Sequence, residues 1–203
     1  MPYDRIKPAL LCGLVALGSV AAIHSDELLD GVDARTLAMT CTSCHGSDGL
    51  SAGPAVPSIG GMNPGYFVKI MEGFRSGEIY SVTMGRIAKG YSDAEIERLA
   101  DYFHDRPFVP AKQDFDPELA AQGRELHDHY CERCHSEGGI ALEGEEYHIL
   151  AGQWVTYLRN AMEDFRTGRR PLDKKMKRKL DRLLEREGET SLDALLAFYA
   201  SQQ

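Results

Sequence analysis

Cys41-Thr42-Ser43-Cys44-His45 and Cys131-Glu132-Arg133-Cys134-His135 share one pattern, two cysteines separated by two residues and followed directly by a histidine. This pattern is typical of c-type haem attachment. One helical turn presents both thiols to the two vinyl groups of a porphyrin, and the adjacent imidazole becomes the proximal ligand of the iron. The two stretches therefore predict two covalently bound haems, and with them a dihaem electron-transfer protein.

Three other uses of paired cysteines are less consistent with these stretches. A thioredoxin-like redox pair has the same cysteine spacing but a βαβ setting and no histidine directly after it. Zinc ribbons rarely place a histidine immediately after both cysteine pairs. Two structural disulfides are the third alternative, because the chain has features of an exported protein. The repeated histidine favours haem over all three.

The N-terminus has the features of a secretory signal peptide. Arg5 and Lys7 form a basic start, an apolar run covers residues 9–23, and Val20-Ala21-Ala22 offers small residues for cleavage. The run is shorter than the roughly 20 residues that a membrane-spanning helix needs. Thioether bonds of c-type cytochromes are made on the outer side of the bacterial inner membrane, so export agrees with haem. We predict a signal peptide at 1–22 and a periplasmic protein, from which Cys12 is removed.

Composition narrows the classes of partner. The 203 residues include 23 Lys and Arg against 31 Asp and Glu, a formal net charge of -8. This balance argues against nucleic acid as a partner and favours solubility and basic docking partners. After residue 23 no stretch is long and apolar enough to span a membrane, so we predict no membrane span in the mature chain.

The chain after the signal peptide is an internal repeat. Residues 61–66 (Gly-Met-Asn-Pro-Gly-Tyr) align with 152–157 (Gly-Gln-Trp-Val-Thr-Tyr), and without a gap 71–77 align with 162–168. Prolines between the halves predict an extended linker, because proline cannot continue a helix. The predicted domains are 23–106 and 118–203, joined by a linker at 107–117. A domain of about 80 residues has a thin core, to which haem would add apolar volume.

Each half reads as helices and loops. Asp33 is a predicted N-cap for a helix that runs through Met39 to Cys41, and Pro117 begins one that runs to Cys131. Ser92-Asp93-Ala94-Glu95 is a capping box for a helix over 93–103, and Thr190 to Asp193 opens its counterpart. Sustained alternation of apolar and polar residues is absent, so the predicted fold is all-α.

The sixth ligand of each iron is predicted from a matched pair of methionines. Met84 and Met176 follow the two motif histidines at nearly equal spacing, and so do Met71 and Met162. Met71 belongs to the apolar stripe of a predicted helix, which is more simply explained as core, whereas Met84 and Met176 lie beyond turn residues. We therefore predict Met84 and Met176 as ligands, with the other pair as the competing assignment. Histidines outside the motifs are the bis-histidine alternatives, and we interpret them as surface or supporting residues: His104, His127, His129 and His148.

A basic run from Arg169 to Arg182 surrounds Met176 in this otherwise acidic chain. It is interpreted as a solvated helix face or as a charged surface beside the second haem that meets an acidic partner. The first interpretation is slightly favoured.

Longer stretches carry a resemblance to a known family. Residues 84–92 (Met-Gly-Arg-Ile-Ala-Lys-Gly-Tyr-Ser), 147–154 (Tyr-His-Ile-Leu-Ala-Gly-Gln-Trp) and the C-terminal 193–203 are far more specific than the haem motifs alone. With two tandem class I cytochrome c domains, each wrapped around one covalent haem, the chain resembles the dihaem cytochrome c4 group. It is similar above all to the cytochrome subunits of flavocytochrome c sulfide dehydrogenases.

The resemblance implies a specific role. Cys41, Cys44, His45 and Met84 would hold the first haem c, and the second would be held by Cys131, Cys134, His135 and Met176. The chain would form a periplasmic heterodimer with a subunit that carries FAD and oxidises sulfide. Electrons would pass from the flavin through both haems to a soluble cytochrome c, so this chain would not be catalytic by itself.

Two features depart from the pattern, and two other roles stay open. The second half lacks counterparts of Pro54 and Pro57, which leaves the backbone acceptor of its proximal histidine open. The region after Met176 is also longer and more basic than the region after Met84, which favours a subunit with a dedicated partner. A free c4-type carrier that feeds a terminal oxidase is the alternative. A dihaem peroxidase or thiosulfate-oxidising enzyme needs an open or unusually ligated iron, which the matched methionines speak against.

Overall fold

The computed structural model describes residues 31–140 and 147–203, and the predicted signal peptide lies outside these ranges. Within them the chain is helical and has no β-strand, which confirms the predicted all-α fold. None of the helices in these two ranges is long and apolar enough to cross a membrane. The elements are α2 (Ala34–Ala38), α3 (Thr42–His45), η1 (Ser47–Gly49), α4 (Pro64–Ser76), α5 (Met84–Ile87), η2 (Ala88–Gly90), α6 (Asp93–His104), α7 (Pro117–Tyr130), α8 (Val155–Arg166), α9 (Lys174–Glu187) and α10 (Thr190–Ser201).

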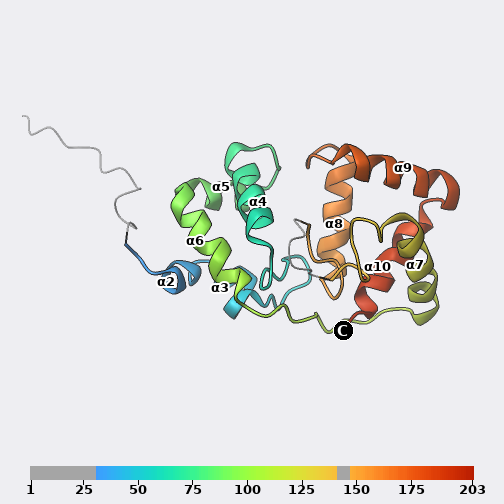
Figure 1. The fold of residues 1–203 in the computed structure, drawn as a ribbon, viewed down its shortest axis with the longest axis horizontal. Coiled ribbons are helices and arrows are strands. Elements are labelled where there is room, and N and C mark those ends of the chain that lie inside the picture. The colour runs from blue at the N-terminus through green and yellow to red at the C-terminus, as the bar shows by residue number, and fades with distance from the viewer. Residues whose placement is uncertain (1–30, 141–146) are drawn as a thin grey trace, which may run out of the picture.

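The helices form two groups side by side along the long axis of the molecule, α2 to α6 in one and α7 to α10 in the other (Figure 1). In the first group, α4 and α6 pack together around the rings of Phe67 and Phe103, whose centroids are 5.8 Å apart. Ile96 and Leu99 of α6 and Leu37 of α2 complete the buried centre. The apolar residues of α6 recur at helical spacing, so one face of this helix supplies most of that core.

In the second group, α7 and α10 pack closely along their lengths. Gly123 of α7 makes this possible, because a Cβ there would lie 1.9 Å from the Ala194 carbonyl oxygen of α10. Phe198 and Tyr199 of α10 and Leu183 of α9 are the buried centre of this group. Two hydrophobic clusters, each drawn from one half of the chain, thus stabilise the two groups.

The internal repeat is visible in matched backbone hydrogen bonds. Gly61 N–H donates to the Phe103 carbonyl at 2.8 Å, and Gly152 N–H donates to the Tyr199 carbonyl at the same distance, 2.8 Å. Ile59 likewise donates to the Gly49 carbonyl at 2.8 Å, and its counterpart Leu150 donates to the Gly139 carbonyl at 2.8 Å. The first pair of bonds ties the loop after each cysteine motif to the last helix of its half, and the second pair closes the loop on itself.

The four predicted helix starts are confirmed, and one predicted end is wrong. The Asp33 side chain accepts from Thr36 N–H at the start of α2, and Pro117 is the first residue of α7. However, α2 ends at Ala38, and the chain reaches Cys41 through turns. Helix α10 begins at Thr190 as predicted, and its N-cap residue Glu189 has a helical conformation and makes no side-chain capping bond within the described residues. Residues 107–116 form no helix, in agreement with an extended linker, while the exact domain boundaries stay a prediction.

Side-chain hydrogen bonds join the two groups. The amide of Gln153 accepts from Ser58 N–H at 3.0 Å and donates to the Ser58 carbonyl at 2.9 Å. The Trp154 indole donates to the Ser51 carbonyl at 3.0 Å, and Tyr157 N–H donates to the Pro54 carbonyl at 2.9 Å. The loop after the first cysteine motif is therefore held by the start of α8.

Candidate haem-attachment sites

Each cysteine motif folds into a single helical turn. Cys44 N–H donates to the Cys41 carbonyl at 3.2 Å and His45 N–H donates to the same oxygen at 2.9 Å. In the second motif, Cys134 and His135 both donate to the Cys131 carbonyl at 3.0 Å. This is the turn that the spacing predicts, because residues three and four apart on a helix share one face.

The first cysteine of each motif is partly buried against the hydrophobic cluster of its own half. Burial raises the pKa of the Cys41 thiol and raises that of Cys131 to about 11. A reactive thioredoxin-like cysteine has a lowered pKa, so these environments argue against a redox pair. The four described cysteines form no disulfide with one another. Thiols set against an apolar core suit attachment to an apolar porphyrin.

His45 is fixed as the neutral tautomer that a metal ligand requires. Its Nδ1–H donates to the Pro57 carbonyl at 2.9 Å, which leaves the Nε2 lone pair for a metal. Burial lowers the pKa of this imidazole, and the hydrogen bond to Pro57 opposes that effect. The first half thus has a backbone acceptor at one of its prolines. In the second half, the His135 ring lies 5.3 Å from the ring of Tyr147.

The methionines occupy two kinds of position. Met71 is 6% exposed on α4 within the first core, and its counterpart Met162 is partly buried on α8 against the second core. Met84 begins α5 and packs, partly buried, against the same core as Cys41. Met176 is half-buried in the first turn of α9. The assignment of Met84 and Met176 as iron ligands stays a prediction.

A group of polar and aromatic side chains lies where the two halves meet. Arg170, which is 8% exposed, donates to the Tyr66 hydroxyl at 2.9 Å and to the Tyr157 hydroxyl at 3.5 Å. The His148 ring stacks on Tyr66 with centroids 5.9 Å apart and meets Tyr157 edge-on at 5.2 Å. We call Tyr66, His148, Tyr157 and Arg170 the junction cluster.

The junction cluster has unsatisfied polar groups. Both ring nitrogens of His148 are buried and have no hydrogen-bond partner among the residues that the structure describes. Burial lowers the pKa of His148 to about 3, and the charge of Arg170 adds to that effect. Arg170 forms no ion pair within residues 31–140 and 147–203. Buried cations and imidazoles are normally paired, so this environment suits an added carboxylate, and haem carries two propionate carboxylates. The residues present therefore fit haem.

Sequence reasoning missed the junction cluster. His148 was interpreted as a surface or supporting residue, and Arg170 as part of an exposed basic run, yet Arg170 is buried. The available signal was His148 itself, which replaces a proline of the first half. Of the other histidines, His104 and His129 are exposed, whereas His127 is buried and bonded to Tyr199 and Glu132.

Comparison with known proteins identifies the family to which the chain belongs. No family model matches the chain. A cytochrome c4 of Azotobacter vinelandii is 30% identical over 186 residues, which cover 83% of this chain and 86% of that protein. This chain belongs to the cytochrome c4 family.

Other members of this wider group have named redox roles. A thiosulfate dehydrogenase electron acceptor of Stutzerimonas stutzeri is 31% identical over 150 residues, 69% of each chain. The cytochrome subunit of sulfide dehydrogenase of Chlorobaculum tepidum is 43% identical over 67 residues, which cover 33% of this chain and 60% of that subunit. The crystal structure of reduced cytochrome c4 from Pseudomonas stutzeri superposes with a TM-score of 0.71 at 23% identity, covering 84% of this chain and 97% of that one.

Together these findings support a dihaem cytochrome fold and a function in electron transfer for this cytochrome c4 family member. The resemblance noted in the sequence is confirmed at the level of the family. The haem c cofactor follows from that membership and from the two cysteine motifs.

Proposed function

We propose that this chain binds two covalent haems and is the electron-transfer subunit of a periplasmic sulfide dehydrogenase. The main support for this proposal is the pair of matched Cys-x-x-Cys-His turns, each of which packs against the hydrophobic cluster of its own half. The first haem would be held by Cys41, Cys44, His45 and Met84, and the second by Cys131, Cys134, His135 and Met176. Haem supplies reversible one-electron chemistry of iron, and a methionine ligand raises its potential.

The proposed partner is an FAD subunit that oxidises sulfide. Support comes from the 43% identity to the cytochrome subunit of sulfide dehydrogenase, the highest identity among the three relatives described above. Support also comes from the long basic helix α9, which contains Met176 and whose counterpart at Met84 is the short α5. In this assembly FAD belongs to the partner alone, and this chain carries electrons onward to a soluble cytochrome c.

The junction between the halves suits electron exchange between two haems. In the proposed holoprotein, Arg170 and His148 hold haem carboxylates, which gives Arg170 an anionic partner and the ring nitrogens of His148 a hydrogen-bond partner. Gln153 and Trp154 fix the loop of the first half against the second. A junction made of buried hydrogen bonds keeps the distance between two redox centres constant, which a flexible tether would not do.

The test is purification of the native protein from periplasm, with absorption spectra recorded before and after sulfide is added. We expect a flavin band that copurifies with this chain and haem bands that sulfide reduces completely. Haem bands that sulfide leaves oxidised, with no second chain present, would contradict the dehydrogenase assignment.

A free electron carrier is the second candidate, because the relatives matched over most of their length are cytochrome c4 and a thiosulfate dehydrogenase electron acceptor. The same purification separates the candidates. A single dihaem chain that accepts electrons from a separately purified thiosulfate dehydrogenase, and not from sulfide, would establish the carrier role.

A further inference from the structure

Helix α9 carries a concentration of positive charge that the fold does not require. Its sequence holds Lys174, Lys175, Lys177, Arg178, Lys179, Arg182 and Arg186, in a chain whose net charge is -8. The corresponding segment of the first half is α5 followed by η2, where the cations are Arg86 and Lys89. Because the short α5 and η2 occupy the corresponding position in the first half, the repeat does not explain the length and charge of α9.

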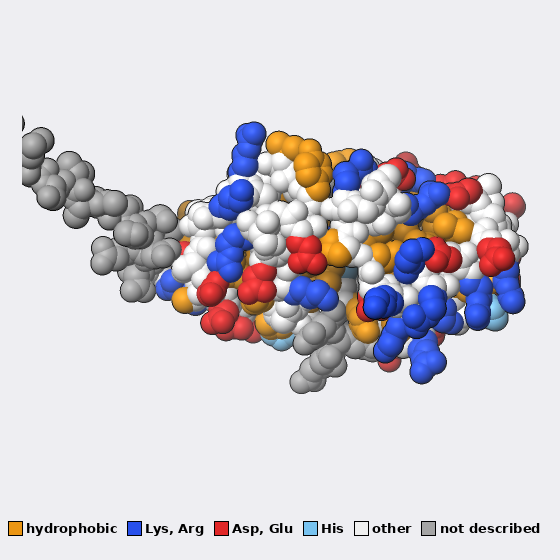
Figure 2. Space-filling model, turned by 90° about the horizontal axis from the view of Figure 1, so that it is seen from above, with side chains coloured by type: hydrophobic (Ala, Val, Ile, Leu, Met, Phe, Trp, Pro, Cys, Tyr) orange, Lys and Arg blue, Asp and Glu red, His pale blue; other side chains and the backbone are white. Residues whose placement is uncertain are grey.

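Helix α9 is amphipathic, with apolar residues on one face and charged residues on the other. Leu180 and Leu183 are buried against the second hydrophobic cluster, while every Lys and Arg of α9 is exposed. Lys and Arg side chains gather at the right of the space-filling view, the end of the molecule that α9 covers in Figure 1 (Figure 2). We call the surface formed by Lys174, Lys175, Arg178, Lys179 and Arg182 the basic face.

The basic face is not neutralised within the chain. Lys177 pairs with Asp181 at 2.8 Å, and the residues of the basic face form no ion pair within the described parts of the chain. Like charges one turn apart on a helix repel one another, so this arrangement costs stability. Other surface cations of the same half do have partners, such as Arg169 with Asp164 and Arg159 with Asp193. The basic face therefore groups five cations on one helix, around Met176, that have no ion pair among the described residues.

Helix α9, which carries the basic face, packs beside the second haem-attachment motif. The Asp173 side chain accepts from Lys175 N–H at 2.7 Å and from Met176 N–H at 3.4 Å, which fixes the first turn of α9. Leu180 and Leu183 of this helix belong to the hydrophobic cluster against which Cys131 packs, and the Tyr130 hydroxyl, one residue before Cys131, donates to the Glu187 carboxylate of α9 at 2.7 Å. A protein bound on the basic face would therefore lie next to the second haem.

We propose that the basic face of α9 is the docking surface for an acidic redox protein that exchanges electrons with the second haem. The inference rests on the proposed function, in which Cys131, His135 and Met176 hold that haem. Complementary charge raises the rate of encounter by about 10- to 1,000-fold and orients the partners without requiring tight binding. The acidic remainder of the molecule strengthens the orientation, because it repels the same partner elsewhere.

A protein fits this surface better than an anionic membrane does. Peripheral membrane helices insert an apolar face into the lipid interface. The apolar face of α9 is already buried against the second core through Leu180 and Leu183. The exposed side offers charge alone, which suits a transient complex between soluble proteins.

The test compares two charge-reversal variants of the holoprotein that change net charge equally. One carries Lys174→Glu, Lys175→Glu and Arg178→Glu in the basic face. Its matched control carries Lys69→Glu, Arg86→Glu and Lys89→Glu, which are exposed cations of the first half. The probe is reduced flavodoxin, a small acidic FMN protein, mixed with each oxidised cytochrome in a stopped-flow spectrometer. Haem content and circular dichroism verify that each variant is folded.

At an ionic strength of about 0.01 M, where the Debye length is about 30 Å, we expect the basic-face variant to react at least about tenfold more slowly than the wild type. The control should change the rate less than about twofold, and the difference should disappear at high salt. A rate unchanged in the basic-face variant, or lowered equally in both variants, would overturn the proposal. So would loss of binding to phosphatidylglycerol vesicles without an effect on the flavodoxin rate.

The two proposals fail in different ways. If flavodoxin reduces the basic-face variant as fast as the wild type, electron transfer stands and only the docking surface is wrong. If neither haem of the wild type accepts electrons, the proposed function itself is wrong.

Discussion

The two halves of this cytochrome share one backbone scheme, and two of their differences concern contacts with neighbours. Each half uses a cysteine-motif turn, a loop bonded back to its last helix, and a separate hydrophobic cluster. They differ at the junction, where Met62 of the first half is replaced by Gln153 of the second. They differ again at the surface, where a short α5 is replaced by the long basic α9.

The shared features are those that hold a haem, whereas these two differences lie where a haem domain meets other redox centres. The features common to both halves are the ones that shape a haem pocket: thiols, imidazole, loop and core. The features that differ face the other half or the solvent. These two changes in the second half therefore concern contacts of the haem domain with a neighbour.

The largest effect is expected from removing one pair of thiols. Cys41→Ala with Cys44→Ala should abolish the first covalent haem, and the half-protein around it should lose structure, because a core of this size depends on the porphyrin. Cys131→Ala with Cys134→Ala should do the same in the second half. Pyridine haemochrome assays and circular dichroism measure both. Retention of the full haem content in either variant would contradict the attachment sites.

A large change in potential is expected from the methionines. Met84→His and Met176→His should each lower the midpoint potential of one haem, by a substantial part of the about 0.8 V that axial ligands span. The other haem should keep its potential, as spectroelectrochemical titration would show. Met71→Leu and Met162→Leu are the matched controls and should leave both potentials nearly unchanged. Should the controls shift the potentials instead, the competing pair would be the ligands.

A moderate effect is expected at the junction. Gln153→Met places the residue of the first half into the second and leaves Ser58 N–H and its carbonyl without partners. Each buried backbone group left unpaired costs about 1–3 kcal/mol, so we expect a loss of about 2 kcal/mol or more. Urea unfolding followed by haem absorption would measure it. Adding Met62→Gln to this variant is not expected to restore the stability, because the groups left without partners are the N–H and the carbonyl of Ser58.

Sequence reasoning succeeded where the signal is local. The cysteine motifs, the Asp33 and Ser92 caps and the start of α7 at Pro117 all depend on residues within one or two turns, and all of them are observed. The repeat also followed from sequence, because matched residues make matched bonds.

Contacts between the halves could not be predicted in the same way. Arg170 lies in a run of exposed cations, yet it is buried among Tyr157 and Phe165 of its own half and Tyr66 of the other half. Gln153 is 0% exposed, although its type is common on surfaces. Burial of these residues depends on how the halves meet, which periodicity within either half does not specify.

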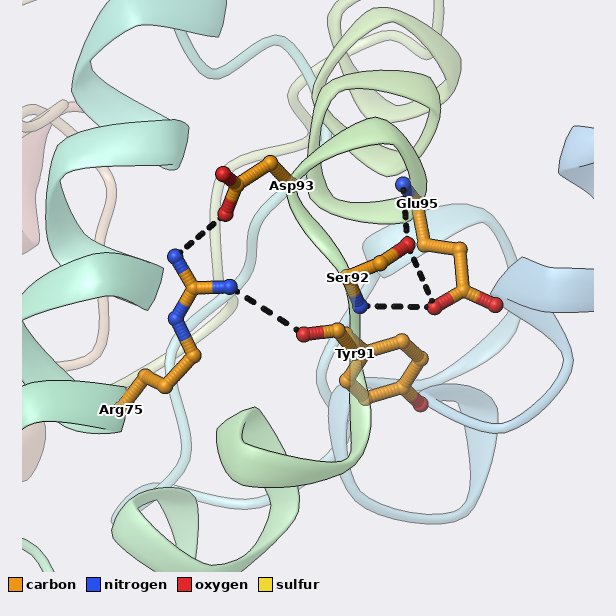
Figure 3. A network of polar contacts seen from close by, with 5 residues as sticks. All are labelled: Arg75, Tyr91, Ser92, Asp93 and Glu95. Atoms are coloured by element: carbon orange, nitrogen blue, oxygen red, sulfur yellow. Dashed lines mark hydrogen bonds and ion pairs between the residues drawn. The ribbon is translucent and has the colours of Figure 1, made fainter. Parts of the chain in front are cut away.

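The smallest expected effect is a difference in stability between variants at the start of α6 and at the start of α10. Ser92 and Glu95 form a reciprocal capping box, with Ser92 N–H donating to the Glu95 carboxylate at 2.8 Å, and Arg75 holds the neighbouring Asp93 (Figure 3). Ser92→Ala should therefore cost about 1 kcal/mol. Thr190→Ala should change stability by only a few tenths of a kcal/mol, because α10 has no side-chain cap. The reason is that Glu189 already has a helical conformation, which moves the helix start away from the Thr190 side chain. Urea midpoints of the two variants measure the contrast, and equal losses would show that Thr190 caps α10 after all.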